Sequence, residues 1–166
     1  MVDDFFKNWE HKSEEGAKSY SRLLDRAGKN AILKRLPELH EAATEKVNCL
    51  DCARCCKNYS PRFKTTDIRR ISKHLNMRES ELIDRHLNLD EEGDFVVKTH
   101  PCPFLNSDNT CSIYEVRPSD CARFPYTDED VIVKRPRLTV KNASFCPITF
   151  YVLENLKTEW EKGQLK

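Results

Sequence analysis

Four of the eight cysteines in this 166-residue chain lie within eight residues, in the segment Cys-Leu-Asp-Cys-Ala-Arg-Cys-Cys at 49–56. Cysteine thiolates are ligands for zinc ions and for iron-sulfur clusters. Because Cys49, Cys52 and Cys55 are spaced by three, a short loop can turn all three toward one metal centre. Cys56 follows Cys55 directly, and neighbouring side chains of an extended segment point apart. We therefore expect one of this pair to serve a second site or to lie just behind the first.

The other four cysteines stand singly, as Cys102, Cys111, Cys121 and Cys146, with 8, 9 and 24 residues between them. Zinc modules usually face two Cys-x-x-Cys pairs toward each other, which this spacing does not supply. A Cys-x-x-Cys-x-x-Cys run with a distant Cys-Pro is instead similar to the ligand run of bacterial ferredoxins. Both Cys102 and Cys146 are followed by proline. The spacing favours a 4Fe-4S cluster, although eight thiols also suffice for two four-cysteine sites, or for one cluster and a separate zinc or iron ion.

Charge and hydropathy give no support for a nucleic-acid or a membrane partner. Lys and Arg total 28 against 27 for Asp and Glu, so net charge gives no argument for nucleic acid. No apolar run approaches the roughly 18 residues that span a bilayer, and the segment 1–7 lacks the basic and then apolar order of a signal peptide. We expect a cytoplasmic protein with no membrane partner, in which reduced thiols serve as metal ligands or catalytic groups. A disulfide framework is the alternative if a secretion signal is present.

Four basic residues lie within four positions of a cysteine in the sequence. Four thiolates leave about two negative charges on a zinc dication or on a 2+ cluster core. Arg54, Lys57, Arg117 and Arg123 could offset that charge or donate hydrogen bonds to sulfur; for Arg54 and Lys57 a role in surface solubility is an equal alternative. We therefore predict Arg117 and Arg123 as cofactor-binding residues. The five histidines show no paired ligand spacing, and His100, two positions before Cys102, is a candidate to support a ligand.

The apolar residues have helical spacing over most of the chain. We expect one helix to end near Gly28 and a second, from Asn30, to lead into Cys49 with Pro37 in its first turn or at a kink. Thr65 is expected to begin another helix, and Asn76 the next, with Glu79 in capping-box position. Cys146-Pro147 is expected to open the last helix, which has a buried stripe of Ile148, Val152, Leu156 and Trp160.

Short strands complete the expected fold. We predict a strand at 95–99, and a small hairpin that pairs 131–134 with 138–140 around Pro136. The fold class is α-rich with a few short β-strands: a single helical domain wrapped around a cysteine-rich metal-binding centre. Its predicted parts are an N-terminal helical arm, the cysteine-cluster domain and a C-terminal helix packed on the same domain, at 1–44, 45–150 and 147–166.

The two short helices after Thr65 also have the order of a helix-turn-helix motif. The second of them begins with Glu79, Glu81 and Asp84. These carboxylates would face DNA phosphates if the helix lay in a groove. A helical hairpin that supports the metal site is therefore the preferred interpretation, and a nucleic-acid partner is disfavoured.

The cysteine segments together resemble the YkgJ-type cysteine-cluster family, whose motif is CxxCxxCC. The resemblance covers roughly residues 45 to 150 and rests on the segments 49–56, 101–105, 111–118, 121–125 and Cys146-Pro147. The family is described as a "putative zinc- or iron-chelating domain" and is similar to part of flagellin lysine N-methylase. The resemblance implies that all eight cysteines are candidate metal ligands: Cys49, Cys52, Cys55, Cys56, Cys102, Cys111, Cys121 and Cys146. Ala122 is a small departure, because related chains often have arginine directly after the cysteine.

Three functions follow as hypotheses. The first is a metal-binding protein that chelates iron, as an iron-sulfur cluster, or zinc. The second is a metal-dependent enzyme related to protein lysine N-methylation; the chain has 4 glycines and no glycine-rich cofactor loop, so such chemistry would use the metal itself. The third is a zinc-stabilised interaction module for a protein or nucleic-acid partner, for which the near-neutral charge and the missing basic stripe give little support. In each case we expect folding to depend on the metal.

Overall fold

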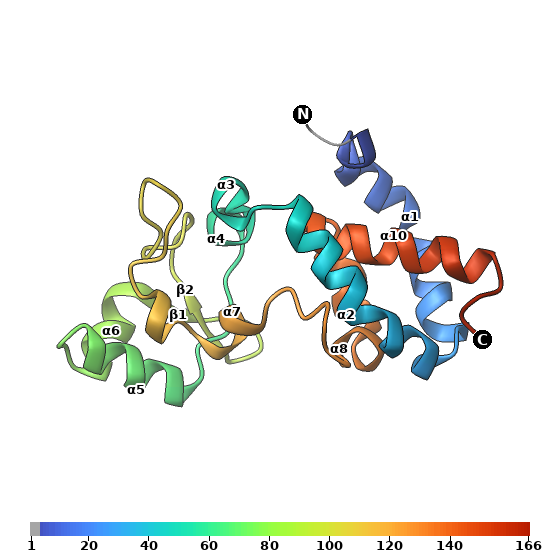
Figure 1. Ribbon diagram of the computed structural model, residues 1–166. Coiled ribbons are helices and arrows are strands. Elements are labelled where there is room, and N and C mark those ends of the chain that lie inside the picture. Colours follow the sequence, from blue (N-terminus) through green and yellow to red (C-terminus); the bar gives the residue numbers. More distant parts are fainter. Residues whose placement is uncertain (1–3) are drawn as a thin grey trace. The chain divides into compact units, whose positions relative to one another are not determined.

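The computed structural model describes residues 4–166, and in these residues the fold is mostly helical with one two-stranded antiparallel sheet. The α-rich fold predicted from the sequence is confirmed. The chain divides into two compact units (Figure 1): unit 1 comprises residues 4–48 with Pro125–Lys166, and unit 2 comprises Cys49–Phe124. The domain boundaries predicted at 44/45 and 150 stay a prediction, and residues 1–3 of the predicted arm lie outside the described residues.

Unit 1 is a bundle of helices. Its elements are η1 (Asp4–Phe6), α1 (Trp9–Arg26), α2 (Lys29–Lys46), α8 (Val131–Lys134), α9 (Pro136–Ala143) and α10 (Pro147–Glu161). Helix α10 packs against α1, α2 and α9. Large side chains of these helices are fully buried, among them Tyr20, Leu36, Phe150 and Leu153. Within residues 4–166, no helix is both long enough and apolar enough to cross a membrane.

Most helix ends of unit 1 follow the sequence prediction. Helix α1 ends at Arg26, close to the predicted end near Gly28, and α2 leads the chain toward Cys49. Pro37 lies inside α2 rather than in its first turn. Cys146 is the N-cap of α10 and Pro147 its first residue, where a proline costs no hydrogen bond because the first amides of a helix have no partner in the helix. The predicted stripe on α10 is buried at Ile148, Val152 and Leu156 and half-buried at Trp160.

The hairpin predicted around Pro136 is wrong. Residues 131–134 form the single turn α8, in which Lys134 N donates to Asp130 O at 3.0 Å, and Pro136 opens α9. Ile132 and Val133 are buried, so packing outweighs the strand preference of β-branched residues. Pro136 suits the first position of a helix.

Unit 2 is built from shorter elements. They are α3 (Cys49–Cys52), α4 (Arg54–Asn58), α5 (Thr65–His74), α6 (Glu79–His86), β1 (Leu87–Leu89), β2 (Phe95–Val97), η2 (Tyr114–Val116) and α7 (Ser119–Arg123). The strands pair antiparallel with Leu87 opposite Val97 and Leu89 opposite Phe95. Phe63 forms a further bridge to Phe95, with its amide 2.8 Å from the Phe95 carbonyl oxygen.

The predicted start of α5 at Thr65 and the strand from Phe95 are confirmed. The predicted start of the next helix at Asn76 is wrong, because α6 begins at Glu79 with Arg78 as its N-cap. Asn76 has a φ of 53°, a left-handed conformation that asparagine tolerates in turns. Strand β1 was not predicted.

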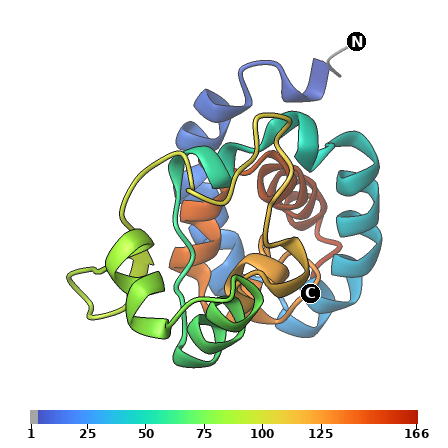
Figure 2. The same ribbon diagram turned by 90° about the vertical axis from the view of Figure 1, so that its left-hand side faces the viewer.

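A hydrophobic cluster holds unit 2 together. Its buried members are Phe63, Ile68, Ile71, Leu82, Leu87, Val97, Phe104 and Ile113. Cys102 and Cys111 pack against this cluster, so two of the cysteines rest directly on the core. Figure 2 shows α5 and α6 in green and the cysteine-bearing loop after β2 in yellow, from a direction at 90° to Figure 1.

Candidate metal centre

The clustered cysteines lie on two consecutive helical turns. Cys49 and Cys52 begin and end α3, and Cys55 and Cys56 lie in α4. Ala53 joins the two turns with a φ of 46°, in the left-handed region. Its amide donates to the Cys49 carbonyl oxygen at 2.8 Å, and its own carbonyl oxygen accepts the amide of Lys57 at 3.0 Å. The chain therefore bends at Ala53, between the second and third cysteines.

The adjacent thiols of Cys55 and Cys56 lie close together, with their Sγ atoms 4.0 Å apart. The expectation that neighbouring side chains point apart is wrong here, because it assumed an extended segment and the pair lies in a helix. Two thiolates on one tetrahedral zinc ion, with bonds of about 2.3 Å, place their sulfurs about 3.8 Å apart. The spacing of this pair is therefore compatible with a shared metal. Assignment of one of them to a second site stays a prediction.

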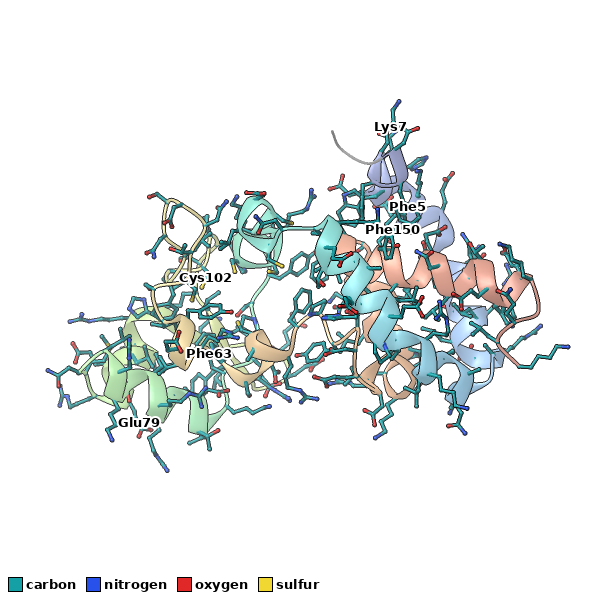
Figure 3. All side chains as sticks on the ribbon, in the orientation of Figure 1. Phe5, Lys7, Phe63, Glu79, Cys102 and Phe150 are labelled. Atoms are coloured by element: carbon teal, nitrogen blue, oxygen red, sulfur yellow. The ribbon has the colours of Figure 1, made fainter. Side chains whose placement is uncertain are left out.

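Backbone hydrogen bonds bring Cys102 to α4. The amide of Cys102 donates to the Cys56 carbonyl oxygen at 2.8 Å. Cys102 is labelled in Figure 3, in the same unit as the core residue Phe63. The chain then returns on itself, since Leu105 and Cys111 form an antiparallel bridge and Ser112 N donates to Phe104 O at 2.9 Å. Cys102 and Cys111 consequently lie near the two ends of one tight loop.

The tip of this loop is attached to α3. Asn109 Nδ2 donates to the Leu50 carbonyl oxygen at 2.7 Å. The tip is closed by the amide of Asn106, which donates to Thr110 O at 2.8 Å. The loop that carries Cys102 and Cys111 is thus tied to α4 at its base and to α3 at its tip.

Helix α7 carries Cys121, and a buried carboxylate that the sequence analysis missed holds the start of this helix. Asp67 is 1% exposed. Its Oδ1 accepts the amide of Ser119 at 3.1 Å, and its Oδ2 accepts the Ser119 hydroxyl at 3.2 Å. The next residue, Asp120, pairs with Lys64 at 2.9 Å and with Arg62 at 3.4 Å. The only sign of Asp67 in the sequence is its position in the first turn of a predicted helix.

The two predicted cofactor-binding arginines lie on either side of Cys121. Arg117 Nη1 donates to the Tyr114 carbonyl oxygen at 2.7 Å, and its guanidinium carbon lies 3.8 Å from the centre of the Tyr114 ring. Burial raises the pKa of Cys121, and the positive charge of Arg117 opposes this rise in part. Arg123 is the last residue of α7. Arg117 therefore acts on a thiol electrostatically, and cofactor binding by either arginine stays a prediction.

Five thiols interact electrostatically with one another, and we call them the inner thiols: Cys55, Cys56, Cys102, Cys111 and Cys121. Burial raises the pKa of Cys121 to about 12, with further contributions from Cys102, Cys55 and Cys111. Burial likewise raises the pKa of Cys102, to which Cys111 and Cys55 add, while a hydrogen bond from the Phe104 amide opposes the shift. The hydrogen bond between Cys55 and Cys56 raises the pKa of Cys55 and lowers that of Cys56.

The remaining two cysteines of unit 2 lie at the edge of this group. Partial desolvation of the thiol raises the pKa of Cys49 although the residue as a whole is exposed, and Cys55 and Cys52 add to the shift. Cys49 is exposed, whereas each of the inner thiols is half-buried. Cys55 is therefore the inner thiol that interacts with Cys49 of α3.

The sequence profile of the CxxCxxCC family, described as "putative zinc- or iron-chelating domain", matches residues 48–147. The chain belongs to the CxxCxxCC family. The resemblance inferred from the cysteine segments is thereby confirmed, and with it the assignment to a zinc- or iron-chelating class. Neither a curated protein nor a solved structure matches the chain.

The CxxCxxCC match includes all eight cysteines, but unit 2 contains only seven of them. Cys146 belongs to unit 1, where it is buried at the start of α10. Its predicted role as a ligand stays a prediction.

The thiols of unit 2 fit the metals named for the CxxCxxCC family in their chemistry, but they are not gathered at ligand distances. No disulfide joins the eight cysteines, all of which lie within residues 4–166, and thiolate sulfur is the ligand shared by zinc sites and iron-sulfur clusters. Among residues 4–166, no three Cys, His, Asp or Glu side chains lie at distances that would hold a metal ion. His100, the histidine nearest to a cysteine in the sequence, is exposed.

Proposed function

We propose that unit 2 holds a metal centre with four thiolates, which are supplied by the inner thiols. The observation that carries this proposal is the convergence of three separate segments: α4, the loop from Cys102 to Cys111, and α7. The hydrogen bond from Cys102 N to Cys56 O joins the first two segments. Electrostatic interaction of Cys121 with Cys102, Cys55 and Cys111 supports the inclusion of α7. Half-burial of all five thiols favours metal binding over surface reactivity.

Iron, bound as an iron-sulfur cluster, is the metal that we propose, and zinc is the alternative. The all-cysteine donor set of the inner thiols supports a cluster, because iron-sulfur clusters are held by four cysteine thiolates. The Phe104 amide donates a hydrogen bond to the sulfur of Cys102, and such bonds stabilise the negative charge that collects on ligand sulfurs. A cluster with four cysteine ligands would transfer electrons or stabilise the fold, whereas zinc with four thiolates would be structural.

Analysis of iron, zinc and acid-labile sulfide in protein purified without oxygen tests this proposal. We expect about four irons and four sulfides per chain, with a broad charge-transfer absorption near 400 nm. One zinc per chain without sulfide would replace the cluster by a structural zinc site. Absence of both metals from freshly purified and from reconstituted protein would refute metal binding.

Substitution of single cysteines by serine tests which thiols bind. We expect Cys102→Ser and Cys121→Ser to lose most of the metal and to lower the free energy of unfolding by several kcal/mol, because metal-binding energy contributes to folding. The matched control is Cys49→Ser, which removes the exposed cysteine of α3 and should retain more than half of the metal. Equal loss in all three variants would contradict the restriction to the inner thiols.

A further inference from the structure

Asp67 is a buried carboxylate with four hydrogen-bond donors around it. Its Oδ2 accepts the amide of Lys64 at 3.0 Å, and its Oδ1 accepts Arg70 Nη2 at 2.8 Å. The other two donors are the amide and the hydroxyl of Ser119. Burial raises the pKa of Asp67, but the hydrogen bonds from Lys64, Arg70 and Ser119 outweigh it, so the pKa lies below its usual range. The carboxylate is therefore ionised, and both of its oxygens accept hydrogen bonds from within the protein.

These contacts join two elements that are far apart in the sequence. Asp67 lies in the first turn of α5, and Ser119 is the first residue of α7. The same Arg70 that binds Asp67 also donates to the Arg117 carbonyl oxygen at 2.8 Å. Helix α5 thus holds the segment that enters α7 at two positions: the guanidinium of Arg70 binds Arg117, and the carboxylate of Asp67 binds Ser119.

Helix α5 is itself fixed to the core of unit 2, because Ile68 and Ile71 are buried in the hydrophobic cluster. Helix α7 is only five residues long, and a helix of one turn has little stability of its own. The position of Cys121, two residues after Ser119, consequently depends on the contacts that anchor the start of α7.

We propose that Asp67 is the positioning residue of the metal centre: its carboxylate fixes the start of α7 and so presents the Cys121 thiolate to the metal. This inference rests on the proposed metal site at the inner thiols. It adds a residue of α5, distant from every cysteine in the sequence, to the parts of the chain that determine metal affinity. Asp67 does not bind the metal and acts through Cys121.

A double-mutant cycle with cobalt(II) as the probe tests this proposal on the full-length chain. The metal-free protein is titrated with Co²⁺, and the thiolate-to-cobalt charge-transfer absorption is followed in four proteins: wild type, Asp67→Asn, Cys121→Ser and the double variant. The side-chain amide introduced by Asp67→Asn would turn an NH₂ group toward donors that now meet a carboxylate oxygen. We expect Asp67→Asn to weaken cobalt binding at least tenfold in the wild-type background and less than twofold in the Cys121→Ser background.

A purely structural role would give a different result. If Asp67 served only the general stability of unit 2, its substitution would weaken cobalt binding by the same factor in both backgrounds, and this outcome would overturn the inference. Unchanged affinity in Asp67→Asn would overturn it as well. Both results leave the proposed metal site intact, because analysis of iron, zinc and sulfide tests that site separately. A wild-type protein that takes up no cobalt into a thiolate site would overturn this inference.

Two further variants keep the test decisive. Ser119→Ala leaves Asp67 bound to Lys64, to Arg70 and to the amide of residue 119, and it removes the hydroxyl that donates to Asp67 Oδ2 and accepts Lys64 Nζ at 3.1 Å. If Asp67→Asn does not fold, this milder change should still weaken cobalt binding about threefold or more, and unchanged affinity would count against the proposal. The matched control is Glu81→Gln, which converts a carboxylate of the same unit that pairs with Arg85 at 2.6 Å. It should bind cobalt as the wild type does.

Discussion

His86 contacts the loop that carries Cys102 and Cys111, and its titration should make the stability of the protein depend on pH. It is half-buried at the end of α6, and its ring centre lies 5.2 Å from that of Phe104. Phe104 belongs to the core cluster, and its carbonyl oxygen accepts the Ser112 amide. Burial lowers the pKa of His86, and the positive charges of Arg85 and Lys98 lower it further. The folded protein therefore favours the neutral ring.

The sign of the pH effect follows from this direction. Because the pKa of His86 is lower in the folded state than in the unfolded state, about 6.5, the unfolded chain binds the proton more tightly. The contribution of His86 to stability is fully present above pH 6.5 and is lost as the pH falls through the folded pKa. We expect the stability difference between wild type and His86→Gln to shrink from pH 8 to pH 5, as measured by urea unfolding at matched metal content.

Subtraction of the two proteins cancels the titration of all groups that they share, including the thiols. A difference that stays constant between pH 8 and pH 5 would show that the pKa of His86 does not change on folding. A difference that grows on acidification would contradict the direction of the shift.

At the scale of the elements, the bend at Ala53 determines how the clustered cysteines face one another. Ala53 is 5% exposed and adopts φ 46° and ψ 18° between α3 and α4. For a residue with a Cβ atom this left-handed conformation costs roughly 1–2 kcal/mol. Glycine would remove the cost but would gain freedom in the unfolded chain, so the two effects oppose each other.

We expect Ala53→Gly to change the free energy of unfolding by less than about 1 kcal/mol and to retain the metal. Ala53→Val should lower it by roughly 2–3 kcal/mol and reduce metal content, because a β-branched side chain is strained in the left-handed region and this site is buried. Urea unfolding with metal analysis of both variants measures the effect. If Ala53→Val kept full stability and full metal content, the bend would not constrain the site.

The longer elements could be predicted from the sequence because local patterns determine them. The helix at Thr65 and the Cys146-Pro147 start of α10 follow from turn residues and apolar spacing. The strand predicted at Ile132 and Val133 was wrong because β-branched residues favour strands only as a local preference. Tertiary packing places these two residues in a helical turn instead. Strand β1 has only three residues and is defined by its pairing with β2. No local sequence pattern could therefore predict it.

The candidate site was predictable in its chemistry and less so in its geometry. Residue types and spacing identify the thiols as a metal-ligand set, but the grouping of α4, the 102–111 loop and α7 depends on long-range hydrogen bonds such as Cys102 N to Cys56 O. The anchoring role of Asp67 depends on Ser119, which lies 52 positions away. Such contacts leave no periodic pattern in a single sequence.

At the scale of the whole molecule, each unit has its own buried residues, and the inner thiols belong entirely to unit 2. Leu82 of α6 belongs to the hydrophobic cluster against which Cys102 and Cys111 pack. Leu153 of α10 lies in unit 1. Both leucines are 0% exposed, so they form a matched pair for a test of how metal binding depends on each unit.

We expect Leu82→Ala and Leu153→Ala each to destabilise the protein by about 2–5 kcal/mol, because truncation of a buried leucine leaves a cavity. Only Leu82→Ala should also weaken metal binding, by tenfold or more, since it loosens the core that supports the inner thiols. The measurements are regional hydrogen exchange, which reports loss of protection in the unit that is mutated, and cobalt titration at a temperature where both variants are folded. If Leu153→Ala weakened metal binding as much as Leu82→Ala, the two units would unfold as one cooperative structure, and metal affinity would depend on the stability of the whole chain.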